Sequence, residues 1–94
     1  MATRVDRAGI EGCITKVNTA IEQLRDAAST INSSMSDLPE YWEGAAYDKA
    51  NSVYEEEYKD LLTQTVPEAV ESFKEYINQC MEKIIELDEQ LAGN

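Results

Sequence analysis

The chain has 94 residues, with 19 Asp and Glu against 8 Lys and Arg for a formal net charge of -11, and it contains no His and only 2 Cys. This length accommodates one small domain, because a second hydrophobic core needs more residues. The composition excludes imidazole acid–base catalysis and argues against a zinc site of the His and Cys type. Its acidity argues against nucleic acid and anionic membranes, which attract Lys and Arg. We therefore expect the partner to be another protein.

Acidic residues 55–57 and Asp60 are the strongest candidates for a cation site, but successive helical residues point about 100° apart and no calcium-loop spacing is present. We interpret them as a solvated helix face. Cys13 has no cationic neighbour nearer than Lys16 to activate it, and no Gly-rich phosphate loop occurs. We therefore expect a protein without enzymatic activity, cofactor or metal.

The first apolar pattern predicts a helix over about residues 6–38, with Asp6 or Thr3 as its N-cap. Apolar residues recur at alternating steps of three and four, and a companion row at steps of seven widens this stripe to about three positions in seven. The stripe comprises Ile10, Cys13, Val17, Ala20, Leu24, Ala27, Ile31 and Leu38, and the companion row comprises Ile14, Ile21, Ala28 and Met35.

Residues 39–44 interrupt this pattern, because Pro39 disfavours a helical conformation in the residue before it and Gly44 relaxes the backbone. A second helix is predicted over about residues 45–91, so the chain should form an antiparallel helix-turn-helix hairpin. The second apolar set comprises Ala46, Ala50, Val53, Tyr54, Tyr58, Leu61 and Leu62, followed by Val66, Val70, Phe73, Ile77, Cys80, Ile84, Leu87 and Leu91.

Pro67 complicates the second helix, because proline removes a backbone hydrogen bond and the apolar phase shifts there. One account is a kink within a continuous helix. The other is a restart in which Thr65 caps and Glu68 completes a capping box. The short interval between Leu62 and Val66 leaves no room for a loop and favours the kink.

The two stripes are wider than one neighbouring helix can cover, so we expect two hairpins to associate into an elongated four-helix bundle. The residues predicted for this hairpin and dimer core are Val17, Leu24, Ile31, Leu38, Val66, Val70, Phe73, Ile77, Ile84 and Leu87.

The two cysteines are interpreted as small buried apolar residues. In a hairpin that turns near residues 41–44, Cys13 would oppose about residue 71. Cys80 would then lie ~13 Å farther along the axis, too far for a disulfide.

Trp42 lies in the turn between the helices, where its ring either covers the end of the hairpin, recognises a partner, or does both. Tyr47, Tyr54 and Tyr58 follow within the next helix and are open to two interpretations, ordinary packing or a docking patch.

The sequence contains no apolar segment typical of a cleaved signal peptide and none long enough to span a membrane, which by itself suggests a cytoplasmic protein. However, Trp42-Glu43-Gly44, with Ala46 on the following helix, resembles the motif of the WXG family of early-secreted-antigen-like proteins. The resemblance extends to nearly the whole chain as architecture, since these are two-helix chains of about one hundred residues.

The resemblance implies a folded dimer that is exported, without a cleaved signal peptide, by the membrane-bound ATPase of a type VII secretion system. Such proteins occur mainly in Gram-positive bacteria, where some contribute to virulence. In the family, Trp42 and Gly44 of one subunit would lie beside the C-terminal export signal of its partner. The cytoplasmic expectation is thereby replaced by secretion.

One departure concerns that signal, which in the family is Tyr followed four residues later by Asp or Glu. None of the five tyrosines satisfies this spacing. Looser matches are Ile84 with Asp88 and Ile85 with Glu89.

Two functions are therefore open. The chain is either a secreted homodimer that acts as an effector or an obligatory export component, or a targeting adaptor. An adaptor would pair with a related helical hairpin, the N-terminal region of a larger type VII toxin.

Overall fold

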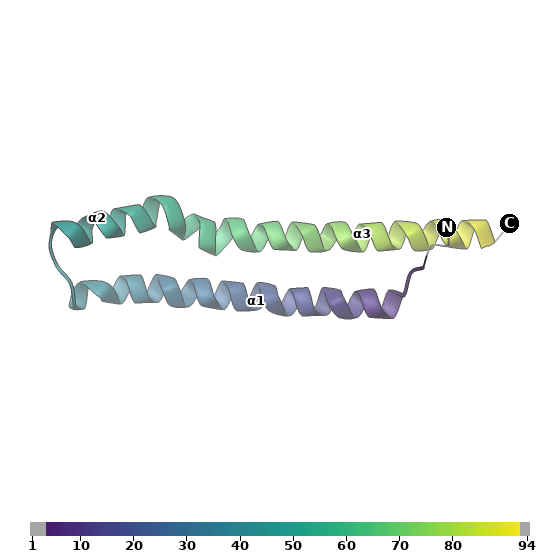
Figure 1. Cartoon of the computed structure of the whole chain (residues 1–94), viewed down its shortest axis with the longest axis horizontal. Coiled ribbons are helices and arrows are strands. Elements are labelled where there is room, and N and C mark those ends of the chain that lie inside the picture. The colour runs from purple at the N-terminus through teal and green to yellow at the C-terminus, as the bar shows by residue number, and fades with distance from the viewer. Residues whose placement is uncertain (1–3, 93–94) are drawn as a thin grey trace.

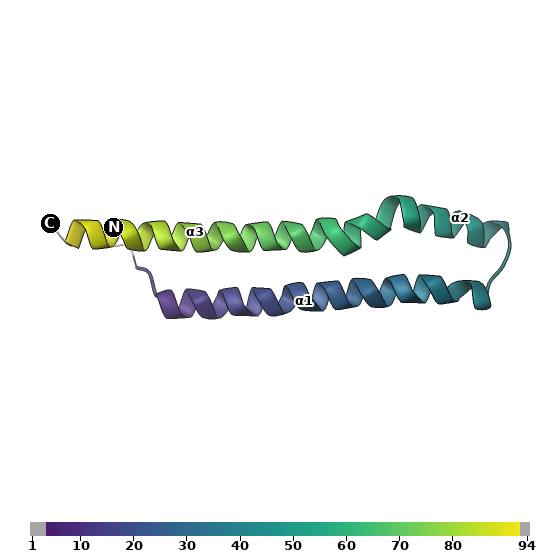
Figure 2. The same cartoon turned by 180° about the vertical axis from the view of Figure 1, so that it is seen from behind.

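The computed structural model describes residues 4–92, except for the side chains of residues 88 and 90–92, and all regular secondary structure in this part of the chain is helical. Helix α1 spans Arg7–Asp37, α2 spans Ala45–Val53 and α3 spans Val66–Ala92. The two arms run antiparallel along a molecule of 73 × 19 × 19 Å (Figures 1 and 2). The predicted all-α helical hairpin is confirmed. None of the helices described has an apolar stretch sufficient to cross a bilayer.

Helix α1 begins where the sequence predicts, because the Asp6 side chain accepts a hydrogen bond of 3.0 Å from the Gly9 N–H and so caps the helix. The alternative cap, Thr3, lies outside the described residues. At the other end, a 3₁₀ turn over Leu38–Glu40 tightens the chain.

The turn that follows is closed by backbone hydrogen bonds and one glycine. The N–H groups of Tyr41 and Trp42 donate to the Leu38 carbonyl at 2.9 and 3.1 Å. Gly44 then adopts φ 130° and ψ 179° immediately before α2. This backbone region is essentially restricted to glycine, so the glycine of the motif is required by conformation.

The second arm remains helical from residue 45 to residue 92 but contains two π-helical segments, Tyr54–Tyr58 and Leu61–Thr65. In them, the Lys59 N–H donates to Tyr54 and the Val66 N–H to Leu61, a spacing of five residues. A π turn accommodates one additional residue. These turns therefore absorb the shift in apolar phase before Pro67, and Thr65 lies inside the second segment with no loop beside it.

On α1, the seam between the arms is formed by the companion row, in which Ile21 and Ala28 are buried. On α3, its buried residues are Met81 and Pro67. The residues predicted for the hairpin and dimer core flank this seam. Val17, Leu38, Val66, Val70 and Ile77 are half-buried, whereas Leu24, Ile31, Phe73, Ile84 and Leu87 are exposed in the single hairpin.

The register of the arms differs from that of a symmetric hairpin, which would place about residue 66 opposite Asn18. Instead, the Lys74 ammonium donates to the Asn18 amide oxygen at 2.8 Å. The symmetric register is therefore wrong, and the two π-helical segments of the second arm, which each accommodate an additional residue, account for part of the difference. Cys13 accordingly lies beside Ile77 rather than residue 71. Both cysteines are free, as predicted, but both are exposed in the single hairpin.

Gly12 in α1 and Gly44 in the turn allow a matched test of whether Gly44 is required by its backbone conformation. At both Gly12 and Gly44 an added Cβ meets no atom within 4 Å, but only Gly44 has a positive φ. We expect Gly12→Ala to raise the free energy of unfolding by about 0.5–1 kcal/mol, because alanine favours the helix. Gly44→Ala should lower it by about 1–3 kcal/mol through backbone strain. Urea denaturation followed by circular dichroism measures both, and equal effects would contradict the assignment.

Candidate functional site

One side of the hairpin is a continuous apolar surface, which we call the apolar face. Successive residues of an α-helix point 100° apart, which places the exposed stripe residues of each arm on one flank of its helix. Because the two arms are antiparallel, these flanks lie on the same side of the hairpin. The residues of the apolar face are Cys13, Val17, Leu24 and Ile31 of α1 and Phe73, Tyr76, Cys80, Ile84 and Leu87 of α3.

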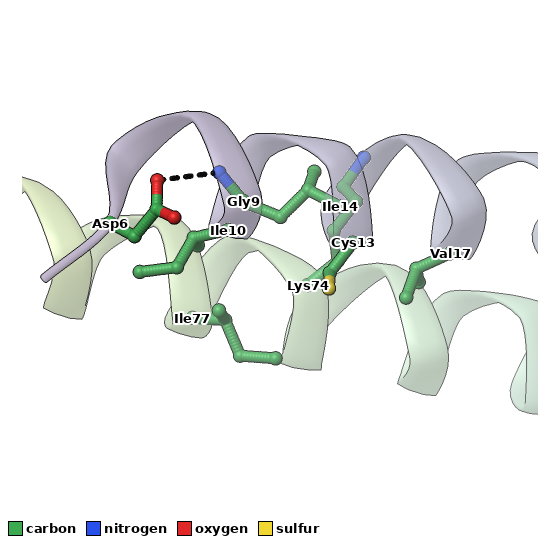
Figure 3. A pocket seen from close by; sticks show the side chains of 8 residues that line it. All are labelled: Asp6, Gly9, Ile10, Cys13, Ile14, Val17, Lys74 and Ile77. Atoms are coloured by element: carbon green, nitrogen blue, oxygen red, sulfur yellow. Dashed lines mark hydrogen bonds between the residues drawn. The ribbon is translucent and has the colours of Figure 1, made fainter.

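Two hollows near the open end of the hairpin lie on this face. The first, of about 430 Å³, is bordered by the start of α1 from Asp6 to Val17 and by Lys74 and Ile77 of α3 (Figure 3). The second, of about 340 Å³, shares Ile10 and Ile77 with the first. The hollows therefore form one apolar depression that the hairpin does not fill from its own side chains.

An aromatic pair borders the second hollow. The rings of Phe73 and Tyr76 stack with centroids 6.5 Å apart, and each residue is 62% exposed. Interaction with the Cys80 thiol raises the pKa of the Tyr76 hydroxyl above its ordinary value, so the tyrosine stays neutral. An apolar surface of this extent is typical of an interaction site.

The opposite side of the seam is polar. Arg7 forms ion pairs with Glu11 and Glu82, which raise the pKa of its guanidinium, and Arg25 pairs with Glu71 at 3.3 Å. By the helical period, the carboxylates of residues 7–37 and 66–87 all lie on this polar side. These exposed pairs contribute little to stability. Because these carboxylates lie on the polar side, the apolar face is almost free of negative charge. In the described part of the chain, no group of Cys, Asp and Glu is arranged to hold a metal ion.

Two polar contacts at the seam escape sequence analysis. Lys74, whose side chain is only 14% exposed, donates to Asn18, and the Tyr54 hydroxyl donates to the Asn32 amide oxygen at 3.2 Å. A polar pair between packed helices is satisfied in only one alignment, so such pairs specify register. The only signal in the sequence is the presence of Asn18 and Asn32 beside the first apolar stripe.

The turn presents two aromatic side chains at the end of the molecule. Trp42 is 42% exposed and packs edge to face against Tyr47, with ring centroids 5.7 Å apart and an interplanar angle of 67°. Tyr41 is 81% exposed. The Trp42 ring is thus partly packed and partly available to a partner. Of the two interpretations of the tyrosines in the second arm, ordinary packing applies to Tyr54, which is buried, whereas Tyr58 is exposed.

The motif and the C-terminal residues lie at opposite ends of the hairpin (Figure 1). Trp42 and Gly44 are in the turn, whereas the exposed Ile84 lies near the end of α3. The side chain of Asp88 lies outside the described residues. A single hairpin therefore does not bring the two candidate export elements together.

Comparison with protein-family models finds no match, and comparisons with curated proteins and with solved structures find no significant match either. Any functional assignment therefore depends on the motif, the hairpin and its surfaces.

The single tryptophan makes the turn directly measurable. We expect acrylamide to quench Trp42 fluorescence at an intermediate rate, and Tyr47→Leu to increase that rate because the covering ring is lost. Tyr41→Leu is the control, since Tyr41 is more exposed and has no ring contact with Trp42. Equal quenching in both variants would contradict the Trp42–Tyr47 packing.

Proposed function

We propose that this chain is a small, non-enzymatic type VII secretion substrate, exported as a folded dimer and acting through protein–protein binding. The observation that supports this most strongly is the turn. Trp42 is partly exposed at the tip of an elongated hairpin, and Gly44 occupies a backbone conformation essentially restricted to glycine. Both residues of the motif thus have a physical role at the position that the WXG resemblance implies.

The dimer is supported by the apolar face. Leu24, Ile31 and Phe73 of this face remain exposed within the hairpin. A second hairpin would supply a second neighbour for each helix. A second copy suits this face because the carboxylates of residues 7–37 and 66–87 are on the other side. Along these segments, two strongly acidic chains can therefore meet without placing like charges opposite one another.

The direction of the dimer follows from where the export elements lie. In an antiparallel pair, the turn of one copy would be beside the end of α3 of the other. Trp42 and the partner's Ile84 would then form the bipartite signal that the resemblance implies, although the turn and the end of α3 lie at opposite ends of one hairpin (Figure 2). The product would be secreted without a cleaved signal peptide.

The alternative is a targeting adaptor that pairs with the helical N-terminal region of a larger type VII toxin. The absence of Tyr followed four residues later by an acidic residue favours it, because the partner would then supply the signal. The same apolar face would receive the related hairpin, so the two functions differ in the identity of the partner.

We expect Phe73→Asp to convert the dimer to a monomer, because it would bury a charge in the interface. The hairpin should remain helical, since Phe73 is 62% exposed within it. Ser72→Asp adds the same charge one position away, outside the apolar face, and should remain dimeric. Sedimentation velocity with circular dichroism tests both variants. Equal masses for the two variants would contradict the interface, and a chain that dimerises only with a toxin region would support the adaptor.

We expect Trp42→Ala to lower the amount of protein in culture supernatants by about tenfold or more, as loss of a buried aromatic anchor does in other interfaces. Tyr41→Ala, which removes a neighbouring exposed ring, should have a smaller effect. Immunoblots of supernatant and cell fractions measure export. Unchanged secretion of a folded Trp42→Ala dimer would remove the export role from this residue.

A further inference from the structure

The end of the hairpin that contains the turn is less extensively packed than the rest. Helix α1 packs along α3 and along the π-helical segment Leu61–Thr65, but α2 makes few contacts with α1. No residue of α2 is buried. The residues that are buried in the seam, such as Ile21 and Met81, lie farther toward the open end. The hairpin thus consists of a packed body and a loosely packed tip, which we define as residues 41–53.

The two π-helical segments separate the tip from the body. Each replaces α-helical bonds with bonds of five-residue spacing, from Lys59 to Tyr54 and from Val66 to Leu61. π-Helical segments are uncommon and frequently occur at functional sites. Pro67, which lies two residues after the second segment, is almost fully buried and cannot donate a backbone hydrogen bond. The second segment packs along α1, so the first segment, Tyr54–Tyr58, marks the boundary between the tip and the packed body.

Tyr54 joins the tip to α1 at the start of this irregular region. It is 7% exposed, and its hydroxyl donates to Asn32 of α1 at 3.2 Å. The four residues that follow it, from Glu55 to Tyr58, are all exposed. The buried ring and its hydrogen bond are thus well placed to decide whether the tip lies against α1.

We propose that residues 41–53 open from the body as one unit, with the segments between Tyr54 and Thr65 as the hinge and the Tyr54–Asn32 contact as the latch. Opening breaks this contact, the two backbone hydrogen bonds from Tyr41 and Trp42 to Leu38, and little apolar packing, so it costs less than unfolding the body. The motion moves Trp42 relative to α1 while leaving the body paired. A protein that binds Trp42 in only one arrangement would then shift the balance between open and closed tips.

Hydrogen exchange measured by mass spectrometry tests this inference on the full chain. We expect amides of residues 45–53 to exchange about tenfold or more faster than those of residues 14–31 and 68–81. Tyr54→Phe keeps the buried ring but removes the donor, and it should raise exchange in the tip by about fivefold, the effect of one neutral hydrogen bond, without changing the body. Asn32→Ala should act in the same direction.

Tyr58→Phe is the matched control, because it removes the hydroxyl of an exposed tyrosine in the same π-helical segment and should change nothing. Uniform protection along the arm, or equal effects of Tyr54→Phe on tip and body, would overturn the inference. Repeating the measurement with Phe73→Asp separates tip opening from any cover by a second copy. The result is independent of export, so failure of the secretion proposal would leave it intact.

Discussion

The structure depends on one geometric constraint, which is that each helix has more apolar surface than a single neighbouring helix can cover. The seam takes only the central row, where residues such as Ala28 let the helices approach. The remaining apolar side chains are turned to one side because both arms follow the same helical period in opposite directions. An isolated hairpin of this composition therefore necessarily has one apolar side. Stability and association are consequently linked, since the uncovered residues gain from burial only when a partner is present.

Charge is distributed by the same constraint. The carboxylates of residues 7–37 and 66–87 lie beyond the seam on the polar side, where Arg7 and Arg25 offset part of them. The large net charge thus favours solubility without opposing contact between apolar faces. The partly buried Lys74 is held in the seam by Asn18, so even a cation close to the packed surface serves alignment of the arms.

Local patterns predicted the elements and their ends well. The period of the apolar residues gave both arms, Asp6 was identified as a cap from residue type, and the turn was located by Pro39 and Gly44. Periodicity could not tell which of two neighbouring rows faces the seam, because both belong to one stripe. It also could not predict the register, since the π-helical segments are defined by backbone hydrogen bonds such as that from Lys59 to Tyr54. Trp42 and Gly44 were found from a short motif, whereas isolated polar contacts such as Tyr54–Asn32 have no periodic signal.

The slender shape of the molecule, 73 Å long and 19 Å across, has a consequence for how it unfolds. In a compact domain most residues share one core, so losing part of it weakens the whole. Here each turn of helix touches only the turns beside and opposite it, and the hairpin resembles a one-dimensional zipper whose stability is a sum of neighbouring steps. Such a chain can fray from either end with little effect at the other. Cooperative unfolding along the full length would have to come from a second chain that bridges the strong and weak regions.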